Sequence, residues 1–227
     1  MKNLCIIPAR AGSKRIPKKN IKPFMGKPIM AYSIEAALQS GLFDEVMVST
    51  DSEEFADVAR LYGAKVPFLR SEATANDYAT TADVLFEVLE KYKEQGRVFD
   101  NLCCLYSTAP FVTKENLQKA YGLLCDEIDA SFTVVEYSYP IQRSLVVKDG
   151  KIGMAYPEFA ASRSQDLEKH YHDAGQFYFI KTAALLEHKT LWAPRTAPLV
   201  LSELNVQDLD TETDWKLAEM KYQLLNQ

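Results

Sequence analysis

The sequence predicts an α/β fold with a mainly parallel sheet, and three observations lead to that prediction. Short apolar runs, of the length of buried strands, alternate along the chain with helical patterns. Repetition of this kind places helices on both faces of a parallel sheet. The chain has 227 residues, 47% of them apolar and 25% charged, so it can bury a full core. We therefore expect a single domain over residues 1–227.

The individual elements follow from apolar patterning and from boundary residues. Buried strands are expected at residues 4–8, 45–50, 65–69, 101–106, 130–135 and 176–180. Helices are expected at residues 28–40, 53–62, 81–95, 114–127 and 211–225. Pro28 suits a helix start, and Gly41 suits the residue after a helix end. Thr211, with Asp214 three residues later, predicts a capping box for the last helix.

The middle of the chain departs from this alternation. Asp149-Gly150 lies between two alternating arms within residues 145–156, which is the pattern of a β-hairpin. The residues after it, up to about 172, are polar and irregular. We interpret residues 137–175 as an insertion that forms an arm or a lid.

Charge is unevenly distributed along the chain. Of the 26 Lys and Arg residues, eight lie within residues 1–34, which contain no acid, so 18 remain against all 31 acidic residues. A cationic segment on an otherwise anionic protein favours a small anionic partner, such as a polyphosphate. A long nucleic acid is excluded as a partner, because the rest of the surface would repel it. A solvated basic loop is the alternative that composition alone favours.

The chain shows no sign of a membrane or an exported protein. No apolar run approaches the roughly 20 residues that cross a bilayer, and the apolar stretch at the N-terminus is too short for a secretory signal. The four cysteines (Cys5, Cys103, Cys104 and Cys125) lie in apolar segments without a C-x-x-C spacing. We expect buried thiols in a reducing compartment, hence a cytoplasmic protein with no membrane partner.

The loop after the first predicted strand has the residues that a triphosphate needs. It reads Ala-Arg-Ala-Gly-Ser-Lys-Arg-Ile-Pro-Lys-Lys-Asn over residues 9–20 and is not a Walker A sequence. Gly12 permits close backbone approach, and Ser13 supplies a hydroxyl. Arg10 can bind two phosphate oxygens, while Lys14 and Lys19 act as point charges. Ligands of open parallel sheets bind beyond the carboxyl ends of strands, where this loop is expected to lie.

The same loop resembles the CMP-sialic acid synthetase family of cytidylyltransferases. The pattern Ala-Arg-x-x-Ser-Lys-x-x-x-x-Lys-Asn fills residues 9–20, and the similarity continues through residues 49–51, 70 and 76–81 to 208–212. It implies a three-layer Rossmann-like nucleotidyltransferase fold of the glycosyltransferase-A-like type. It also implies a homodimer in which the insertion contributes to the partner's site. The implied nucleotide-binding residues are Ala9, Arg10, Gly12, Ser13, Lys14, Asn20, Arg70, Ala79, Thr80 and Thr81.

Asp208 and Asp210 are the candidate metal ligands. In an extended segment, residues i and i+2 point the same way, so both carboxylates can face one ion. Mg²⁺ prefers one or two carboxylates together with phosphate oxygens and water, and Mn²⁺ is an alternative. Two acids near a helix N-terminus are also stabilised by its dipole without any metal. The basic loop and the family pattern together favour the metal.

The resemblance implies a Mg²⁺-dependent transfer of CMP from CTP to a nine-carbon sugar acid, with release of pyrophosphate. The sugar hydroxyl attacks the α-phosphate in line, and an ion offsets the developing charge. We assign catalytic roles to Arg10, Lys14, Lys19 and Asp210. No residue is identified as a separate base.

The sugar acid is indicated by the segments 162–167 and 171–178. These read Ser-Arg-Ser-Gln-Asp-Leu and Tyr-His-Asp-Ala-Gly-Gln-Phe-Tyr, and they resemble the pseudaminic acid branch of the family. Sialic acid synthetases usually carry Asn-Gly where this chain has Ala174-Gly175. Such a sugar needs apolar walls and polar anchors. The candidate sugar-binding residues are Tyr106, Gln142, Arg163 and Tyr178.

Three other functions stay open. The first is the same reaction on sialic, legionaminic or another 2-keto sugar acid. The second is a glycosyltransferase that uses a CMP-sugar, because Asp208-Leu209-Asp210 has the form of an Asp-x-Asp motif. The third is a nucleotide sensor without turnover. A product used for bacterial surface glycosylation is a further expectation from the resemblance.

Overall fold

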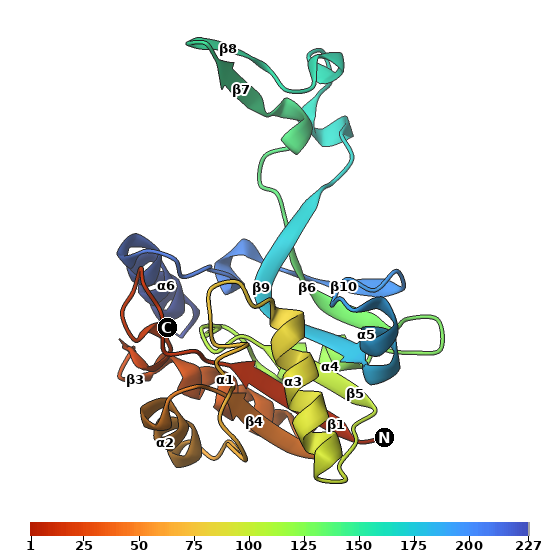
Figure 1. Ribbon diagram of the computed structural model, residues 1–227. Helices are drawn as coiled ribbons and strands as arrows, with labels where there is room; N and C mark the ends of the chain where they lie inside the picture. The colour runs from red at the N-terminus through yellow and green to blue at the C-terminus, as the bar shows by residue number, and fades with distance from the viewer. Residues whose placement is uncertain (227) are drawn as a thin grey trace.

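In the computed structural model, which describes residues 1–226, six strands form a central sheet (Figure 1). From one edge to the other, the strands are β10 (Thr196–Leu201), β6 (Ala130–Glu136), β9 (Tyr171–Lys181), β5 (Asn101–Leu105), β1 (Asn3–Pro8) and β4 (Glu45–Ser49). β1 pairs in parallel with β4 and β5, and β10 pairs in parallel with β6. Only β9 is antiparallel to its neighbours among these strands. The predicted mainly parallel sheet is confirmed.

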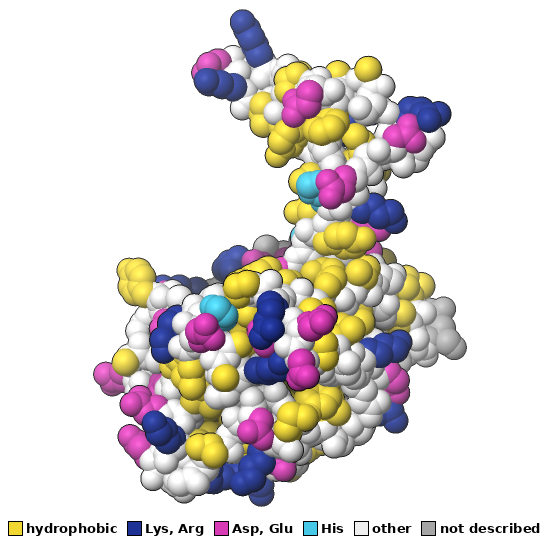
Figure 2. Space-filling view, turned by 90° about the vertical axis from the view of Figure 1, so that its right-hand side faces the viewer, with side chains coloured by type: hydrophobic (Ala, Val, Ile, Leu, Met, Phe, Trp, Pro, Cys, Tyr) yellow, Lys and Arg dark blue, Asp and Glu magenta, His cyan; other side chains and the backbone are white. Residues whose placement is uncertain are grey.

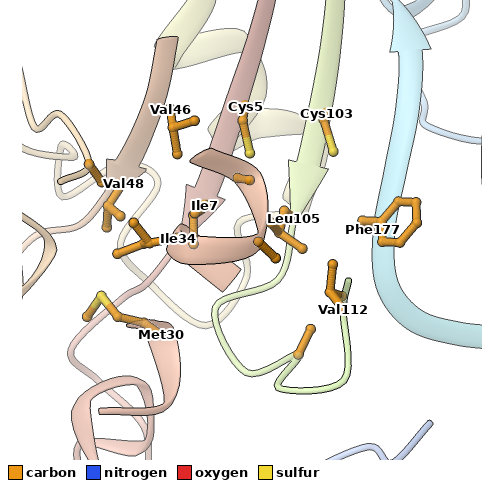
Figure 3. Close-up of a cluster of buried hydrophobic side chains, with 14 of the residues drawn as sticks. Cys5, Ile7, Met30, Ile34, Val46, Val48, Cys103, Leu105, Val112 and Phe177 are labelled. Atoms are coloured by element: carbon orange, nitrogen blue, oxygen red, sulfur yellow. The ribbon is translucent and has the colours of Figure 1, made fainter. Parts of the chain in front are cut away.

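Helices cover both faces of the sheet and make three layers (Figure 1). One face carries α1 (Ile29–Ser40), α2 (Glu53–Leu61) and α4 (Lys114–Tyr121), and the other carries α3 (Thr81–Glu94) and α5 (Thr182–His188). Figure 3 shows the first of these cores, where Met30 and Ile34 of α1 lie over Ile7 of β1 and Val48 of β4. Because residues of a strand alternate between faces, the neighbouring Ile6 lies in the opposite core.

The last helix, α6 (Glu212–Leu225), closes a smaller core beside the basic loop. Its Trp215 packs with Phe24 of the short hairpin β2 (Pro23–Phe24) and β3 (Lys27–Pro28). The predicted capping box is present, because Thr211 Oγ1 accepts from the Asp214 backbone N–H and Asp214 accepts from the Thr211 N–H. The cap therefore fixes where the segment of residues 208–210 meets the helix.

Three of the predicted elements are wrong in part, and one of them is the strand expected over residues 176–180, which begins five residues earlier as β9. Residues 65–69 make only one bridge to the sheet, at Lys65 beside Met47, because Pro67 has no N–H to continue a ladder. The helix expected over residues 114–127 ends at Tyr121, where Gly122 follows. Glycine is a poor helix former, and this accounts for the early end.

Among the elements that were not predicted are β10 and α5. β10 contains Pro198, which argues against a central strand but is compatible with the sheet edge that β10 occupies. α5 follows β9 directly, and its seven residues are too few to show a helical period. Burial of the cysteines was also overestimated, because Cys5, Cys103 and Cys104 are buried but Cys125 is exposed.

The expected hairpin is present and stands away from the sheet on an extended arm (Figure 1). It consists of β7 (Leu145–Lys148) and β8 (Lys151–Met154), joined by Asp149 and Gly150 at φ of 52° and 71°. Positive φ at both positions is the requirement of a type I′ turn. The predicted insertion was too long at its end, because residues 171–175 pair with β6 as part of β9, so we call residues 137–170 the arm. Within residues 1–226, no helix is long and apolar enough to span a bilayer.

Candidate active site

A cavity of about 520 Å³ lies at the carboxyl ends of β1 and β5. Three segments line it: the basic loop after β1, residues 70–84 up to the start of α3, and residues 106–108 after β5. This is the position where ligands bind in open α/β sheets. The predicted site residues that line the cavity are Arg10, Ser13, Lys14, Lys19, Asn20, Arg70, Ala79, Thr80, Thr81 and Tyr106.

The basic loop is held in place by hydrogen bonds from beneath. Asn20 is buried and donates from Nδ2 to the carbonyl of Arg10 at 2.8 Å. Ser107 Oγ lies 2.9 Å from both Asn20 Oδ1 and the Pro8 carbonyl. Asp51 Oδ1 accepts from the backbone N–H of Ala11 at 2.8 Å. These contacts fix the backbone, so the cationic side chains are presented from a defined loop.

Ser107 and Asp51 therefore support the site, and sequence reasoning gave them no role. Both follow the ends of sheet strands, and that position is a usable signal. Two predicted nucleotide-binding residues do not line the cavity. Ala9 is fully buried at the end of β1, and Gly12 lies in the loop beside the Arg10 guanidinium.

Arg10 and Lys14 share a carboxylate that was not predicted. Asp77 accepts from Arg10 Nη1 through one oxygen and from Lys14 Nζ through the other, each at 2.5 Å. The hydrogen bonds from Lys14 and then Arg10 lower the pKa of Asp77 to about 2. Asp77 lies on the opposite wall of the cavity from the basic loop. Its signal in the sequence was an acid inside the stretch 76–81 that the resemblance had already marked.

Lys19 and Arg15 connect the basic loop to the C-terminal aspartates. Lys19 Nζ donates to the Leu209 carbonyl at 2.6 Å and lies 4.0 Å from Asp210 Oδ1. Arg15 Nη2 is 2.8 Å from the same oxygen. Burial lowers the pKa of Lys19, and the charges of Asp210 and Asp208 oppose that effect. Asp210 therefore lies next to the cavity, because its two cationic partners, Arg15 and Lys19, line it.

Asp208 and Asp210, the predicted magnesium ligands, do not themselves line the cavity, and each already has a hydrogen-bond or ion-pair partner. Asp208 Oδ1 accepts the Leu209 N–H at 2.8 Å, and Asp210 is 39% exposed. Across residues 1–226, no cluster of three or more His, Cys, Asp or Glu side chains is arranged to hold a metal. A closed protein cage is therefore not formed there. A pair of carboxylates is instead what Mg²⁺ uses where phosphate oxygens and water complete its shell.

The wall opposite the basic loop is anchored at both ends. Arg70 is buried and donates from Nη2 to the Ser49 carbonyl at 2.7 Å and from Nε to Ser49 Oγ at 3.1 Å. Burial lowers its pKa, against the charges of Asp51 and Glu87. At the other end, Thr80 caps α3 in a capping box with Asp83. The N-terminus of α3 thus faces the cavity, where its dipole favours an anion.

The four predicted sugar-binding residues lie in three places. Tyr106 lines the cavity, and Tyr178 packs behind it, with the ring centroids 5.6 Å apart. Tyr178 is buried and donates from its hydroxyl to Asp173. Gln142 and Arg163 belong to the arm and do not line the cavity. Gln142 donates to the Glu168 carbonyl, and Arg163 pairs with Asp166. The structure of one chain thus brings together most of the predicted nucleotide-binding residues but not the predicted sugar-binding ones.

Comparison with known proteins identifies the family. A model of the family described as cytidylyltransferase matches residues 4–211. The pseudaminic acid cytidylyltransferase of Campylobacter jejuni (serotype O:2) is 45% identical over 226 residues, which cover 99% of this chain and 97% of that protein. The CMP-N,N′-diacetyllegionaminic acid synthase of Legionella pneumophila is 36% identical and is covered over 98% of its length.

A solved structure of CMP:2-keto-3-deoxy-manno-octonic acid synthetase, complexed with CTP, has a TM-score of 0.70 at 20% identity. The alignment covers 100% of this chain and 99% of that one. At this identity the likeness concerns the fold, and it confirms the predicted nucleotidyltransferase architecture. The family match and the relatives, each covered over nearly its full length, show more. The chain belongs to the cytidylyltransferase family.

Proposed function

We propose that this chain transfers CMP from CTP to pseudaminic acid and releases pyrophosphate. The observation that carries the proposal is the 45% identity to a pseudaminic acid cytidylyltransferase, which extends over nearly the whole of both chains. The cavity supports it, because cations, a helix N-terminus and a buried arginine surround a space of about 520 Å³. That size suits a nucleotide together with part of a sugar.

In the proposed reaction, the anomeric hydroxyl oxygen of the sugar forms a bond to the α-phosphorus, its proton passes to water, and the bond to pyrophosphate breaks. Arg10 and Lys14 bind the phosphates from the basic loop, and Lys19 lies deeper, towards Asp210. Fixed donors of this kind stabilise charge that develops in the transition state, because they need no reorganisation at that moment. Arg70, and Thr80 with the start of α3, form the side of the cavity assigned to the base and ribose.

Magnesium is proposed as the cofactor, held by Asp208 and Asp210 together with the phosphates of CTP. When bound, the ion supplies Lewis-acid polarisation of the phosphate and neutralises charge. The chain contributes the geometry. The capping box at Thr211 fixes the segment that carries both aspartates, and Arg15 and Lys19 hold Asp210 against the cavity. Mn²⁺ is the alternative ion, because it accepts the same oxygen ligands.

A homodimer is proposed as the working form, with the arm of each copy reaching the cavity of the other. The arm carries exposed apolar side chains, such as Val147 at 74% and Ile152 at 68% exposure. Figure 2 shows hydrophobic side chains gathered on this projecting part. Gln142 and Arg163 lie on the arm, outside the cavity of their own chain. The cytoplasm is the proposed location, and residues 1–227 are proposed to act as one catalytic domain that carries the arm.

A panel of sugar acids tests the proposal. The protein is incubated with CTP, MgCl₂ and pseudaminic, legionaminic or sialic acid in turn, and pyrophosphate is measured. We expect pseudaminic acid to give the highest kcat/KM. Turnover of legionaminic acid alone would instead favour the second candidate, which the 36% identical relative from Legionella pneumophila supports. If none of the three sugar acids led to release of pyrophosphate, the proposed substrate class would be refuted.

A further inference from the structure

Asp77 forms ion pairs with Arg10 and Lys14, the two cations that the proposed function assigns to the phosphates of CTP. Its carboxylate bridges Arg10 and Lys14, with one oxygen 2.5 Å from each. All three side chains are in contact with solvent, with exposed fractions of 37% for Arg10, 77% for Lys14 and 43% for Asp77. A carboxylate held by two cations in this way has the charge and the hydrogen-bonding character of a phosphate oxygen pair.

The segment around Asp77 is ordered by its own hydrogen bonds. Asn76 donates to the Ala73 carbonyl at 2.8 Å and accepts from the N–H groups of Tyr78 and Ala79 at 2.8 and 3.0 Å. Nearer its start, the segment is held by Glu87 of α3, which accepts from the Ser71 N–H at 2.8 Å. Asp77 therefore stands at a fixed place on the wall, while the long side chains of Arg10 and Lys14 can turn.

A bound polyphosphate and Asp77 carry the same sign of charge and share the same donors. The polyphosphate carries more charge, so it takes Arg10 and Lys14 from the carboxylate when it enters. A carboxylate that has lost both cations would stand unpaired on the cavity wall and would repel the phosphates. With Mg²⁺ and the remaining cations present, binding still proceeds, but it is weaker than it would be without Asp77.

We propose that Asp77 is an internal competitor for Arg10 and Lys14, and that it promotes the departure of pyrophosphate after the transfer. This inference rests on the proposed function. In the transfer, the α-phosphorus gains its bond to the sugar oxygen and loses its bond to pyrophosphate. Pyrophosphate is then bound by cations alone, without the covalent link to the rest of the nucleotide. As it leaves, Asp77 recaptures Arg10 and Lys14. Product release limits turnover in many enzymes, so a group of this kind raises the rate of the cycle.

If Asp77 competes for these cations, its substitution is expected to tighten the binding of pyrophosphate. Removing a side chain that touches binding residues normally weakens binding. Here, Asp77→Asn keeps the size of the side chain and removes its charge, so inorganic pyrophosphate is expected to bind about tenfold more tightly, in line with the removal of one repelling charge at close range. Pyrophosphate is also expected to become a stronger product inhibitor by a similar factor, and kcat is expected to fall.

The matched control is Glu72→Gln. Glu72 is an exposed acid on the same segment, and within residues 1–226 it makes no ion pair with Arg10 or Lys14. Loss of its charge is expected to change pyrophosphate affinity less than about twofold, because exposed charges at longer range are screened by salt. Calorimetry with pyrophosphate, together with the thermal midpoint Tm of each variant, separates a local effect from a folding defect.

The outcomes separate this inference from the proposed function. Pyrophosphate binding that is unchanged or weaker in Asp77→Asn, in a protein with wild-type Tm, would overturn the competitor role. Equal tightening in Glu72→Gln would overturn it as well, because the effect would then be general electrostatics. If the wild-type protein turned over another sugar acid, the proposed substrate would fail, while the pyrophosphate titration would still report on Asp77.

Discussion

The cavity walls and the arm use their side chains in opposite ways. In the cavity walls, buried polar groups such as Asn20 and Arg70 are hydrogen-bonded to backbone carbonyls, and most of the predicted nucleotide-binding residues meet within one chain. In the arm, apolar groups such as Val147 are exposed, and Gln142 and Arg163 do not reach the cavity of their own chain. From this difference we propose that one copy holds all the residues that bind the nucleotide, whereas sugar binding needs a second copy.

The largest effect on activity is expected beside the cavity, at Asp210. Asp210→Ala removes one of the two carboxylates proposed to hold Mg²⁺, and kcat for pyrophosphate release is expected to fall by about 1,000-fold. Glu212→Gln is the control, because it alters an exposed acid two residues away that pairs with Lys22. A variant at Asp210 that keeps more than about a tenth of wild-type kcat would show that the ion is held elsewhere.

The next effect concerns Lys19 and includes a dependence on pH. Lys19→Ala is expected to lower kcat by about 100-fold, the scale for loss of one donor to a developing charge. Burial lowers the pKa of Lys19 below 10.5, so the charged form that the reaction needs is lost as the pH rises through that lowered value. kcat/KM is therefore expected to fall on the alkaline side.

Lys19→Arg is the matched variant for this test. Arginine keeps its charge to higher pH, so the alkaline fall in kcat/KM is expected to move upwards. If the alkaline limb of the profile had the same position in wild-type protein and Lys19→Arg, another group would be responsible for it.

A smaller effect is expected in the arm, and it tests the other side of the comparison. Arg163→Ala is expected to lower kcat/KM for the sugar acid by about tenfold, with the KM for CTP unchanged, because the residue is proposed to contact only the sugar. When Arg163→Ala and Lys19→Ala are coexpressed, mixed dimers combine one intact cavity with the intact arm of the partner. About a quarter of wild-type activity is then expected, because about half of the dimers are mixed and each mixed dimer has one complete site out of two. If the coexpressed protein were no more active than either single variant, the arm would not serve the cavity of the partner.

The smallest effect is expected at Glu87, which anchors the wall opposite the basic loop. Burial alone would raise the pKa of Glu87, but hydrogen bonds from Lys91, Thr74 and Ser71 lower it from 4.5 to about 2. The stability that this carboxylate contributes is fully present above about 4.5 and is lost as the pH falls towards 2.

Glu87→Gln removes that contribution. The variant is expected to have a Tm a few degrees lower at neutral pH, a weaker decline of Tm between pH 4.5 and 3, and a KM for CTP raised about threefold. Glu90→Gln, on the same helix, is the control. Equal acid sensitivity of the wild-type protein and Glu87→Gln would show that Glu87 does not anchor the wall.

Much of the nucleotide side of the site was predictable because its signals are local. The basic loop lies within 12 consecutive residues, and its position after a buried strand was enough to place it at the sheet edge. The same holds for the hairpin, where Asp149 and Gly150 adopt the positive φ that their turn requires.

The features that escaped prediction depend on contacts between distant parts of the chain. The antiparallel direction of β9 is decided by its place between β5 and β6, and the Pro198 strand is acceptable only because it lies at an edge. Asp77 was missed because it pairs with Arg10 across the cavity, and the two residues are 67 positions apart in the sequence. Gln142 and Arg163 were assigned to the sugar and lie in the predicted insertion, but the sequence does not show that this insertion stands outside the cavity of its own chain.

The central claim is that the basic loop and the two late aspartates surround one CTP molecule. A crystal structure of the protein with CTP and MgCl₂ tests it most directly. We predict the triphosphate on Arg10, Lys14 and Lys19, with the ion bound between the phosphates and the carboxylates of Asp208 and Asp210. A triphosphate bound outside this cavity, or an ion that neither aspartate contacts, would contradict the account.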